Sequence, residues 1–540
     1  MSRDSHRTPA TKPWSAVTTR RRVLAGAGGM LGAGLLTGPA RLAAAPRAAQ
    51  DAAAKPGGTF ITAKTTEAPS LDPQTQGSVS RQLRTSLIYS NLLRLDANLE
   101  RQPDLAESYE VSEDGKQVSF RLRQGVKWHP PVSRELVADD VKFSYERLIA
   151  ESPGKSSFAS IQDIEVVDSH TVTFHLSQPD AGLLESMASS WYGSIVNRET
   201  VEQHGDLNNT AVGTGPFIVE EWAVDNELRL RKNPDYFVEG RPYVDQVLIK
   251  VIPDESNIVA GLRSNTIHHA TLEDNLLFDL LEGEGNLTTF RSQRLGFELM
   301  NINNSVPPFD KLQVRQAMSA AIDRAELINV VAGGHAQLTA PASPALKQWQ
   351  LPEEQWKPFY QPDLDKAKQL LAEAGLPNGF ASKLTIITGY PTMASGAQVI
   401  QANLKRIGID LEIESLEAAV WAPRSLSKDP NEWFPLMLNI TPGWTDPDHY
   451  FYRWFHSGAL NINNWSDPEV DALVAEGRAT LDFAQRKAIY DKVQLLFLER
   501  VPMTWHFSPE LIDVTQNYVQ GYWQHPTSYP LSFSDVWLDQ

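Results

Sequence analysis

Residues 307–324 read PPFDKLQVRQAMSAAIDR, and this stretch predicts a helix together with the signal that starts it. Asp310 is placed to cap the first turn, and Gln313, three residues later, can reach back to the cap. Apolar residues then recur with the spacing of one helical face, namely Val314, Ala317, Met318, Ala321 and Ile322. The polar residues between them are expected to face solvent: Arg315, Gln316, Ser319 and Asp323. Taken alone, the pattern predicts a buried helix.

The size and composition of the chain indicate a soluble protein of several domains. At 540 residues it is too long for one compact core, so two or three domains are expected. Its hydrophobic share of 41% and charged share of 21% are typical of globular proteins. The net charge of −17 argues against nucleic acid or anionic lipid as a partner. After the N-terminal region no apolar run reaches the ~18 residues of a membrane helix, so no direct membrane insertion is expected.

Residues 1–54 are predicted to be an export signal. Residues 19–24, TRRRVL, resemble a twin-arginine motif with Arg20 and Arg21 as the pair, and a glycine-diluted apolar run follows. An ordinary secretory signal with three arginines is the alternative, and both routes lead out of the cytoplasm. The chain has no Cys, so neither disulfides nor a lipid-modified cysteine are expected. A diffusible periplasmic protein is predicted.

Short strands and capped helices alternate along the rest of the chain, which predicts a mixed α/β fold. Residues 138–149 have the spacing of a helix, and so do residues 364–374, which end at Gly375. Asp467 followed by Pro468 predicts another helix start. Two half-buried strands are indicated by alternating apolar residues, Val118, Phe120 and Leu122 in one and Val172, Phe174 and Leu176 in the other.

Several short motifs occur in a fixed order: LDP at 71–73, PDLAES at 103–108, LRQGVKWH at 122–129, GTGPF at 213–217, NPDYF at 233–237, AKQLLAEAG at 367–375 and LKRIGI at 404–409. Together with residues 307–324, this series resembles the family-5 extracellular solute-binding proteins, the peptide and nickel receptors of ABC importers. The resemblance covers most of the mature chain.

The resemblance implies a type II periplasmic binding protein-like α/β fold, in which two lobes close on a ligand. It places the first lobe at 55–98, 213–298 and 505–540, an extra subdomain of that lobe at 99–212, and the second lobe at 299–504. The chain is expected to cross between the lobes at hinge residues Phe297, Leu299, Thr504 and Trp505.

Motifs for catalysis are missing from the sequence. There is no H-E-x-x-H, no G-x-S-x-G, no G-x-x-x-x-G-K and no cysteine nucleophile. Any two of the many carboxylates could be paired as in a glycosidase, but nothing selects a pair. We therefore expect no enzyme activity and no cofactor, with a secreted hydrolase as the remote alternative.

The histidines raise the question of a metal site, because the family includes nickel binders. His268 and His269 are adjacent, which is poor ligand spacing, whereas His449 and His456 are two helical turns apart. Ordinary surface or half-buried histidines are the favoured interpretation, so no metal site is predicted.

The ligand site is expected where tryptophans gather, although most of them would pack in the core. Residues 443–448, GWTDPD, resemble a loop that lies at the ligand cleft in this family. In its peptide-binding members, an Asp after the Trp takes the ligand's ammonium group. This loop is shorter here, so Asp446 either replaces that anchor or matches a later D-P-D. The predicted ligand-binding residues are Trp444, Asp446, Trp421, Trp465 and Tyr390.

The expected ligand is a peptide that the protein, acting as a monomer, delivers to the permease subunits of an ABC transporter. Dipeptide binders of the family also offer an Arg to the ligand's carboxylate, but residues 387–392 contain none. An oligosaccharide, an opine-like conjugate or a metal chelate in the same transport role therefore remains the alternative.

Overall fold

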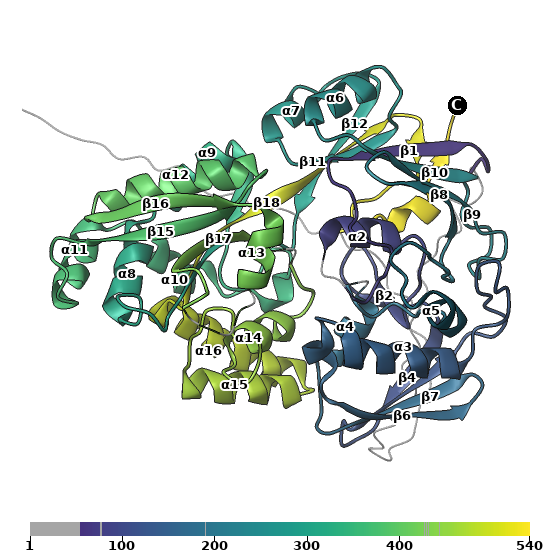
Figure 1. Ribbon diagram of the computed structural model, residues 1–540, viewed down its shortest axis with the longest axis horizontal. Helices are drawn as coiled ribbons and strands as arrows, with labels where there is room; N and C mark the ends of the chain where they lie inside the picture. Colours follow the sequence, from purple (N-terminus) through teal and green to yellow (C-terminus); the bar gives the residue numbers. More distant parts are fainter. Residues whose placement is uncertain are drawn as a thin grey trace, which may run out of the picture. The chain divides into compact units, whose positions relative to one another are not determined.

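The computed structural model describes residues 54–75, 78–189, 191–425, 427, 429, 431–441 and 443–540. The predicted export signal lies almost entirely outside these residues. Within them, twelve strands form one mixed sheet in the order β16-β15-β17-β13-β18-β11-β1-β10-β9-β8, with β12 and β14 also paired to β18 (Figure 1). The mixed α/β class predicted from the sequence is confirmed.

One half of this sheet, with its helices, is called the first lobe. Strand β1 lies parallel to both β10 and β11, whereas β8, β9 and β10 are antiparallel neighbours. Its elements are β1 (Thr59–Lys64), α2 (Val79–Thr85), β8 (Phe217–Ala223), β9 (Glu227–Lys232), β10 (Gln246–Val251), α6 (Glu255–Arg263), β11 (His269–Leu272), α7 (Asn275–Asp279), β12 (Leu287–Gln293), β19 (Val519–Gln520), η4 (Leu531–Ser534) and β20 (Trp537–Leu538).

A subdomain is inserted between the first-lobe elements α2 and β8. Its four-stranded antiparallel sheet has the order β4-β5-β7-β6, and α3 packs on β6 and β7. The predicted apolar strand residues are all buried here, as are Val141, Tyr145 and Leu148 of α3. The elements are β2 (Leu93–Leu95), β3 (Arg101–Pro103), β4 (Ala106–Val111), β5 (Gln117–Leu122), α3 (Ala138–Glu151), η1 (Lys155–Phe158), β6 (Ile161–Asp168), β7 (Thr171–Leu176), α4 (Leu183–Ala188) and α5 (Arg198–His204).

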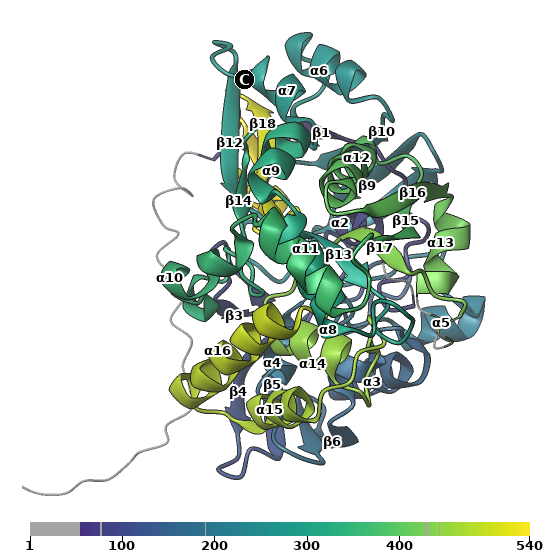
Figure 2. The same cartoon turned by 90° about the vertical axis from the view of Figure 1, so that its left-hand side faces the viewer.

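The other half of the large sheet belongs to the second lobe. In Figure 2, α9 and α12 lie beside strands of this lobe, α12 along β15 and β16 and α9 along β14 and β18, whereas α11 and α16 contact α8. Its elements are β13 (Glu298–Ile302), α8 (Leu312–Ala321), α9 (Arg324–Ala332), β14 (Ala336–Leu338), η2 (Lys347–Trp349), α10 (Glu353–Trp356), η3 (Lys357–Tyr360), α11 (Leu364–Glu373), β15 (Phe380–Ile387), α12 (Pro391–Lys405), β16 (Ile409–Leu416), α13 (Ala418–Ser425), β17 (Leu436–Ile440), α14 (Asp448–Phe455), α15 (Pro468–Ala479) and α16 (Phe483–Arg500).

Strand β18 (Met503–Gln516) belongs to both halves of the large sheet. Its first part pairs with β13 and β14, and its later part pairs with β11 and β12. The chain also passes from β12 to β13 through residues 294–297. Two adjacent segments of backbone therefore join the two lobes.

The helix predicted at 307–324 forms as α8, but two details of the prediction are wrong. Lys311, not Asp310, occupies the cap position and caps no backbone group with its side chain, because the turn at 306–311 delays the helix. Arg315 does not face solvent. It is buried, and it donates to the carbonyl oxygens of Phe309 and Val501 at 2.8 and 3.0 Å. The five apolar residues of the predicted face are fully buried, as expected.

The other predicted helix starts agree with the structure. Asp467 caps α15 by accepting from two backbone N–H groups, and Asp363 caps α11 in the same way with one. Helix α11 is followed by Gly375, whose φ of 78° is left-handed and therefore favours glycine. In each case the residue that starts or ends the helix lies within a few positions of the groups that it contacts, so the sequence alone predicts it.

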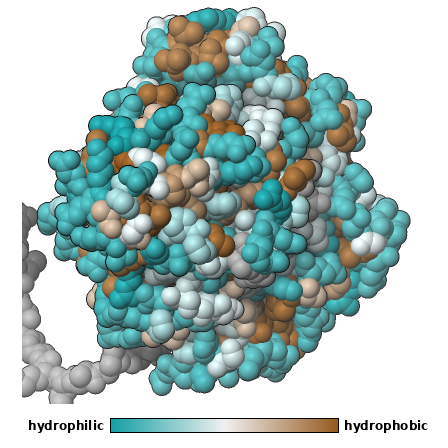
Figure 3. Space-filling view, turned by 60° about the vertical axis from the view of Figure 1, so that its left-hand side comes forward, coloured by the Kyte–Doolittle hydropathy of each residue, from teal (hydrophilic) through white to brown (hydrophobic). Residues whose placement is uncertain are grey.

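The surface seen in Figure 3 is mostly polar, with an apolar group at the top, at the height of α6 and α7. Leu276 in α7 and Leu280 directly after it are exposed, by 70% and 57%. No helix in the described part of the chain is long and apolar enough to cross a membrane.

Candidate functional site

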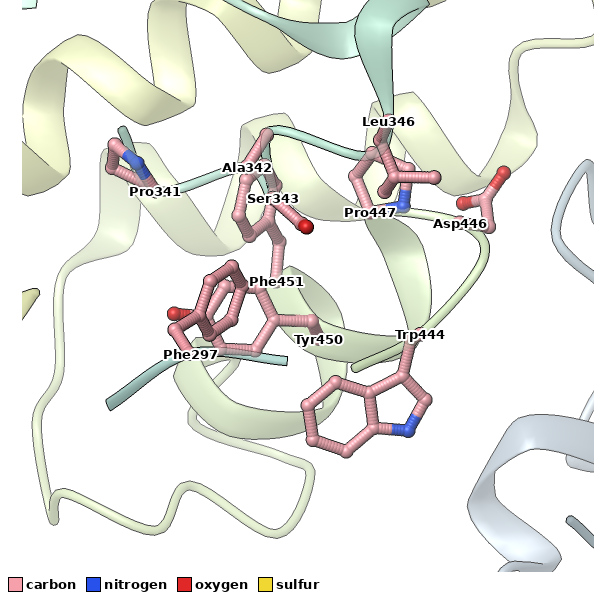
Figure 4. Close-up of a pocket in the computed structure, with 10 residues that line it drawn as sticks. All are labelled: Phe297, Pro341, Ala342, Ser343, Leu346, Trp444, Asp446, Pro447, Tyr450 and Phe451. Atoms are coloured by element: carbon pink, nitrogen blue, oxygen red, sulfur yellow. The ribbon is translucent and has the colours of Figure 1, made fainter. Parts of the chain in front are cut away.

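A hollow in the second lobe brings together segments that are far apart in sequence (Figure 4). It is small and open on one side, and the space between its lining atoms, open solvent included, amounts to about 250 Å³. The lining comes from the segment before β13, from the loop that precedes η2, and from the loop and first turn of α14: Phe297, Pro341, Ala342, Ser343, Leu346, Trp444, Asp446, Pro447, Tyr450 and Phe451. Most of these side chains are apolar or aromatic, as is usual for small-molecule sites.

Stacked aromatic rings form one wall of the hollow. Trp444 is half-buried and lies nearly parallel to Tyr450, with ring centroids 5.7 Å apart and an angle of 13°. The edge of Trp454 meets Trp444 at 5.2 Å, and Phe297 contacts Tyr450 at 5.5 Å. The hydroxyl of Tyr450 also accepts a hydrogen bond from the indole N–H of Trp505. These contacts hold Trp444 as a stiff surface that another flat or apolar group can cover.

Two buried ion pairs support the loop that carries Trp444. Arg486 donates to both carboxylate oxygens of Asp446, at 2.7 and 2.6 Å, and Arg478 donates to Asp448 at 2.7 Å. Burial disfavours the charged form of Asp446, but Arg486 outweighs it and holds the pKa of Asp446 below its usual value. Tyr490 adds a hydrogen bond to Asp448 at 3.1 Å.

Asp446 therefore lines the hollow with its charge already neutralised. Figure 4 shows its carboxylate pointing away from the indole of Trp444. One of its oxygens also accepts from the backbone N–H of Asp448 at 2.8 Å. Direct contact between Asp446 and a ligand stays a prediction.

The same segment touches the inserted subdomain. Nε2 of His449 lies 2.5 Å from Oγ of Ser186, which is in α4. It also lies 3.1 Å from the carbonyl oxygen of Gly182, which directly precedes α4. The backbone N–H of Ala181 donates to the carbonyl of Arg478 at 2.9 Å. Leu99 packs against both the subdomain core and the aromatic core of the second lobe. No sequence signal pairs His449 with α4, because Ser186 lies 263 positions earlier in the chain.

The histidines of α14 are accounted for by these packing contacts. His456 stacks on Tyr452, with ring centroids 4.4 Å apart, instead of sharing a ligand with His449. Among the described residues no group of three or more His, Asp or Glu side chains is arranged to hold a metal ion.

The other predicted ligand residues lie outside the lining of the hollow. Tyr390 precedes α12 and is 46% exposed, and Trp421 lies half-buried in α13 against the aromatic core. Trp465 is buried next to Phe455 and Phe497. This packing gives Trp465 a structural role, and ligand binding by these three residues stays a prediction.

The four predicted hinge residues lie close together on neighbouring strands. Leu299 pairs with Trp505 and Met300 pairs with Thr504 between β13 and β18, and Phe297 directly precedes β13. The ladder between these strands is irregular between Glu298 and Leu299. The backbone passes from one lobe to the other within a few residues of this point, but the hinge motion stays a prediction.

A second, more polar hollow lies in the first lobe, beside β1 and β18. Asp513 accepts from Tyr522 at 2.7 Å there, and Lys64 donates to Thr271 at 2.9 Å. His269 also lines it and is buried, which lowers the pKa of its imidazole well below the usual value. In the sequence, His269 stands out only as a possible metal ligand, and no motif points to Asp513.

The comparisons with known proteins agree on one family. The family described as bacterial extracellular solute-binding proteins, family 5, matches residues 100–461. A relative named di/tripeptide-binding protein 2, from Pseudomonas aeruginosa, is 31% identical over 469 residues, covering 81% of this chain and 86% of the relative. The dipeptide-binding protein of Escherichia coli is 28% identical over 457 residues, covering 78% and 83%.

Solved structures show the same fold. The periplasmic binding protein DppA from Helicobacter pylori, in complex with the peptide STSA, superposes with a TM-score of 0.79 at 28% identity, covering 90% of this chain and 99% of that one. AgaA from A. tumefaciens R10, in complex with agropinic acid, gives a TM-score of 0.80 at 26% identity, covering 89% and 99%. The fold is therefore that of the type II periplasmic binding proteins. From the match over residues 100–461 and the similarity to these relatives, the chain belongs to the bacterial extracellular solute-binding proteins of family 5.

Proposed function

We propose that this protein is the extracytoplasmic substrate-binding component of an ABC importer, and that it binds a peptide between its lobes and delivers it to a membrane permease. The observation that carries the proposal is the aromatic hollow at the loop of Trp444, next to the contact between α14 and the subdomain. Relatives of the chain that are named for di- and tripeptide binding support a peptide as the ligand.

In this proposal Trp444 is the main apolar contact for the ligand. Its ring is half-buried, and Tyr450 and Trp454 pack against it, which restricts its orientation. A ligand that covers a preformed aromatic surface loses little affinity to ordering of the protein. Asp446 contributes by fixing the loop through Arg486, while Trp421 and Tyr390 contact more distant parts of a longer ligand.

Closure would depend on the two backbone segments that join the lobes. Phe297 and Leu299 on one segment, with Thr504 and Trp505 on the other, would absorb the rotation. A ligand that touches both lobes favours the closed state because it has fewer contacts in the open one. No bond of the ligand is made or broken in this function.

A non-peptide ligand in the same transport role is the second candidate. Residues 387–392 contain no Arg to bind a peptide's carboxylate, and the similar protein AgaA was solved with agropinic acid. An opine-like conjugate, an oligosaccharide or a metal chelate would also suit an aromatic wall with neutralised charges.

We further propose that the protein reaches the periplasm by the twin-arginine route, without a lipid anchor, and acts there as a monomer. Arg20 and Arg21 support the route, and the absence of Cys from the sequence supports the lack of an anchor. Substituting both arginines by lysine should stop export, which fractionation of cells would measure.

The function is tested by native mass spectrometry of the purified protein, followed by titration with a pool of di- and tripeptides while tryptophan fluorescence is recorded. We expect a co-purifying peptide mass, and an affinity that Trp444→Ala lowers by on the order of tenfold or more. Trp222→Ala in the edge strand β8 is the matched control and should leave the affinity unchanged. Binding of sugars or chelates without any binding of peptides would overturn the peptide proposal, and recovery of a cleaved ligand would indicate a hydrolase.

A further inference from the structure

Hydrogen bonds hold helix α4 of the subdomain against the second lobe. The hydroxyl of Ser186 and the carbonyl oxygen of Gly182 both contact Nε2 of His449, at 2.5 and 3.1 Å. Just before α4, the backbone N–H of Ala181 donates to the carbonyl oxygen of Arg478 at 2.9 Å. The side chains of Ser186, His449 and Arg478 are buried, so these polar groups have left water together with their partners.

Two other segments of the subdomain extend the same contact. Arg453 of α14 donates to the carbonyl oxygen of Pro153, which lies before η1, at 3.3 Å. A Cβ atom added to Gly115 would lie 2.8 Å from Cδ1 of Leu481, so the turn at Gly115 lies directly against the loop between α15 and α16. Figure 1 accordingly shows α4 beside α14 and α15.

This contact bridges the two lobes. The subdomain is inserted in the first lobe, whereas α14 and α15 belong to the second, and the chain passes between the lobes at residues 294–297 and in β18. A rotation about these two segments that opens the lobes would separate α4 from α14 and break the hydrogen bonds of Ser186 and Ala181. The contact therefore belongs to the closed arrangement.

The groups of this contact stand apart from the ligand hollow. In the described part of the chain, the lining of the hollow includes Asp446 but neither Asp448 nor His449. Asp448 is already paired with Arg478 of its own lobe at 2.7 Å. The contact can thus add to the stability of the closed arrangement without touching a ligand.

We propose that the contact of Ala181, Gly182 and Ser186 with His449 and Arg478 is a latch that stabilises the closed arrangement and raises the affinity for every ligand by a common factor. The inference rests on the proposed function and adds what sets its affinity. The apparent affinity of a protein scales with the fraction of molecules in the state that binds, so a contact that increases this fraction tightens binding without selecting among ligands. Selection stays with the aromatic hollow.

Gly182 offers a way to block the latch without disturbing either lobe. Its φ of −85° and ψ of −10° are helical, so a larger residue can adopt them. A Cβ atom added there would lie 3.3 Å from a carboxylate oxygen of Asp448, across the contact, and 3.6 Å from one of Asp180 on its own side. Gly182→Leu should therefore fit the open arrangement and clash with Asp448 in the closed one.

The first measurement is of closure itself, on the full mature chain. The sequence contains no Cys, so Glu202→Cys in α5 and Glu476→Cys in α15, both exposed, provide two unique sites for nitroxide spin labels. Double electron–electron resonance then gives the distances between the subdomain and the second lobe, without peptide and at a peptide concentration equal to the Kd of the wild type. Gly182→Leu should shift the distribution towards longer distances.

The second measurement is of binding, by isothermal titration calorimetry of the unlabelled chain with two tripeptides from the binding screen that differ in their side chains. Gly182→Leu and His449→Ala should each lower the affinity about three- to tenfold, and by the same factor for both peptides. Trp444→Ala, by contrast, should change the ratio of the two affinities, because it alters the surface that the ligand covers.

The matched controls are Gly285→Leu, where an added Cβ meets no atom of the structure within 4 Å, and His204→Ala at an exposed position of α5. Both should behave as the wild type does, and circular dichroism checks that every variant is folded. Unchanged distances or unchanged affinity in Gly182→Leu, or a loss that differs between the two peptides, overturns the latch and leaves the proposed function standing. Failure of the wild type to bind any peptide overturns the proposed function, and the distances measured without peptide then decide on the latch alone.

Discussion

Two regions of the second lobe bury arginines in opposite ways. At the helices α8 and α9, Arg315 and Arg324 donate mainly to backbone carbonyl oxygens, and burial lowers the pKa of both to about 10. At the loop of Trp444, Arg478 and Arg486 donate to Asp448 and Asp446. Burial opposes their charge as well, but the carboxylates outweigh it and raise the pKa of both arginines.

This difference distinguishes the arginines that hold the helices of the lobe together from the arginines at the candidate site. Arg315 ties the start of α8 to the end of α16, and Arg324 ties α9 to the carbonyl of Trp505 in β18. These arginines join elements through neutral groups. The arginines at the loop instead neutralise carboxylates, so the loop that contacts the ligand in the proposed function carries paired charges.

The largest effect is expected from breaking an ion pair at the loop. Asp446→Asn leaves Arg486 buried without its carboxylate and should lower the free energy of unfolding by about 3–5 kcal/mol, as measured by urea denaturation. Replacing both residues in Asp446→Leu/Arg486→Met should restore much of the loss. Glu412→Gln, at an exposed ion pair with Lys383, is the control and should change little. A fully stable Asp446→Asn would contradict the importance of the pair.

A smaller loss is expected at the scaffold. Arg315→Met removes donors from the carbonyls of Phe309 and Val501 and should cost about 1–3 kcal/mol. The same denaturation series measures it, with the exposed Arg406→Met at the end of α12 as the control. If Arg315→Met costs more than Asp446→Asn, the proposed contrast between the two regions is wrong.

Glu298 is a third kind of buried ionisable group, because its carboxyl lies beside a neutral histidine and not beside an arginine. Its Oε1 atom lies 3.4 Å from Nδ1 of His506, and burial raises its pKa from 4.5 to about 8. The folded state therefore keeps a proton that the unfolded state releases, so this contribution to stability is complete below pH 4.5 and is lost as the pH rises towards 8.

Glu298→Gln should consequently gain stability relative to the wild type as the pH rises from 5 to 8, by up to about 1.4 kcal/mol per pH unit. Urea denaturation at several pH values measures the difference. An equal pH dependence of the two proteins would show that Glu298 does not hold the proton.

The smallest effect is expected at a helix cap. Asp323 accepts from the backbone N–H groups of Ala325 and Glu326, so Asp323→Ala should cost about 1 kcal/mol. Asp310→Ala is the matched control, because Asp310 lies one residue before the cap position of α8 and should cost less. Thermal unfolding of both variants would distinguish them, and an equal loss would contradict the assignment of the caps.

Local signals predicted most elements of the fold but few contacts of the site. The caps at Asp363 and Asp467, and the buried face of α8, depend on residues a few positions apart, which hydrophobic periodicity and capping patterns reveal. Trp444 was found because its loop resembles a family motif. The contact between Ser186 and His449 carries no such motif, and it exists only because α4 meets α14 in the folded chain.

The dependence on residues that are distant in sequence also explains why the solvent exposure predicted for Arg315 is wrong. Arg315 occupies a polar position in the helical pattern, yet it is buried because the end of α16 supplies carbonyl oxygens for it. The pairing of Asp446 with Arg486, forty residues away in sequence, also carries no local signal, and ligand contact by Asp446 stays a prediction.

The sequence by itself determined the mixed α/β fold, the family and the course of α8, α11 and α15, because these follow from the spacing and type of neighbouring residues. Only the tertiary structure decided which charges are neutralised and which buried polar groups meet one another. Charges and hydrogen bonds are satisfied by whatever lies nearby in space, and for Asp446, Arg315 and His449 those groups come from distant parts of the chain.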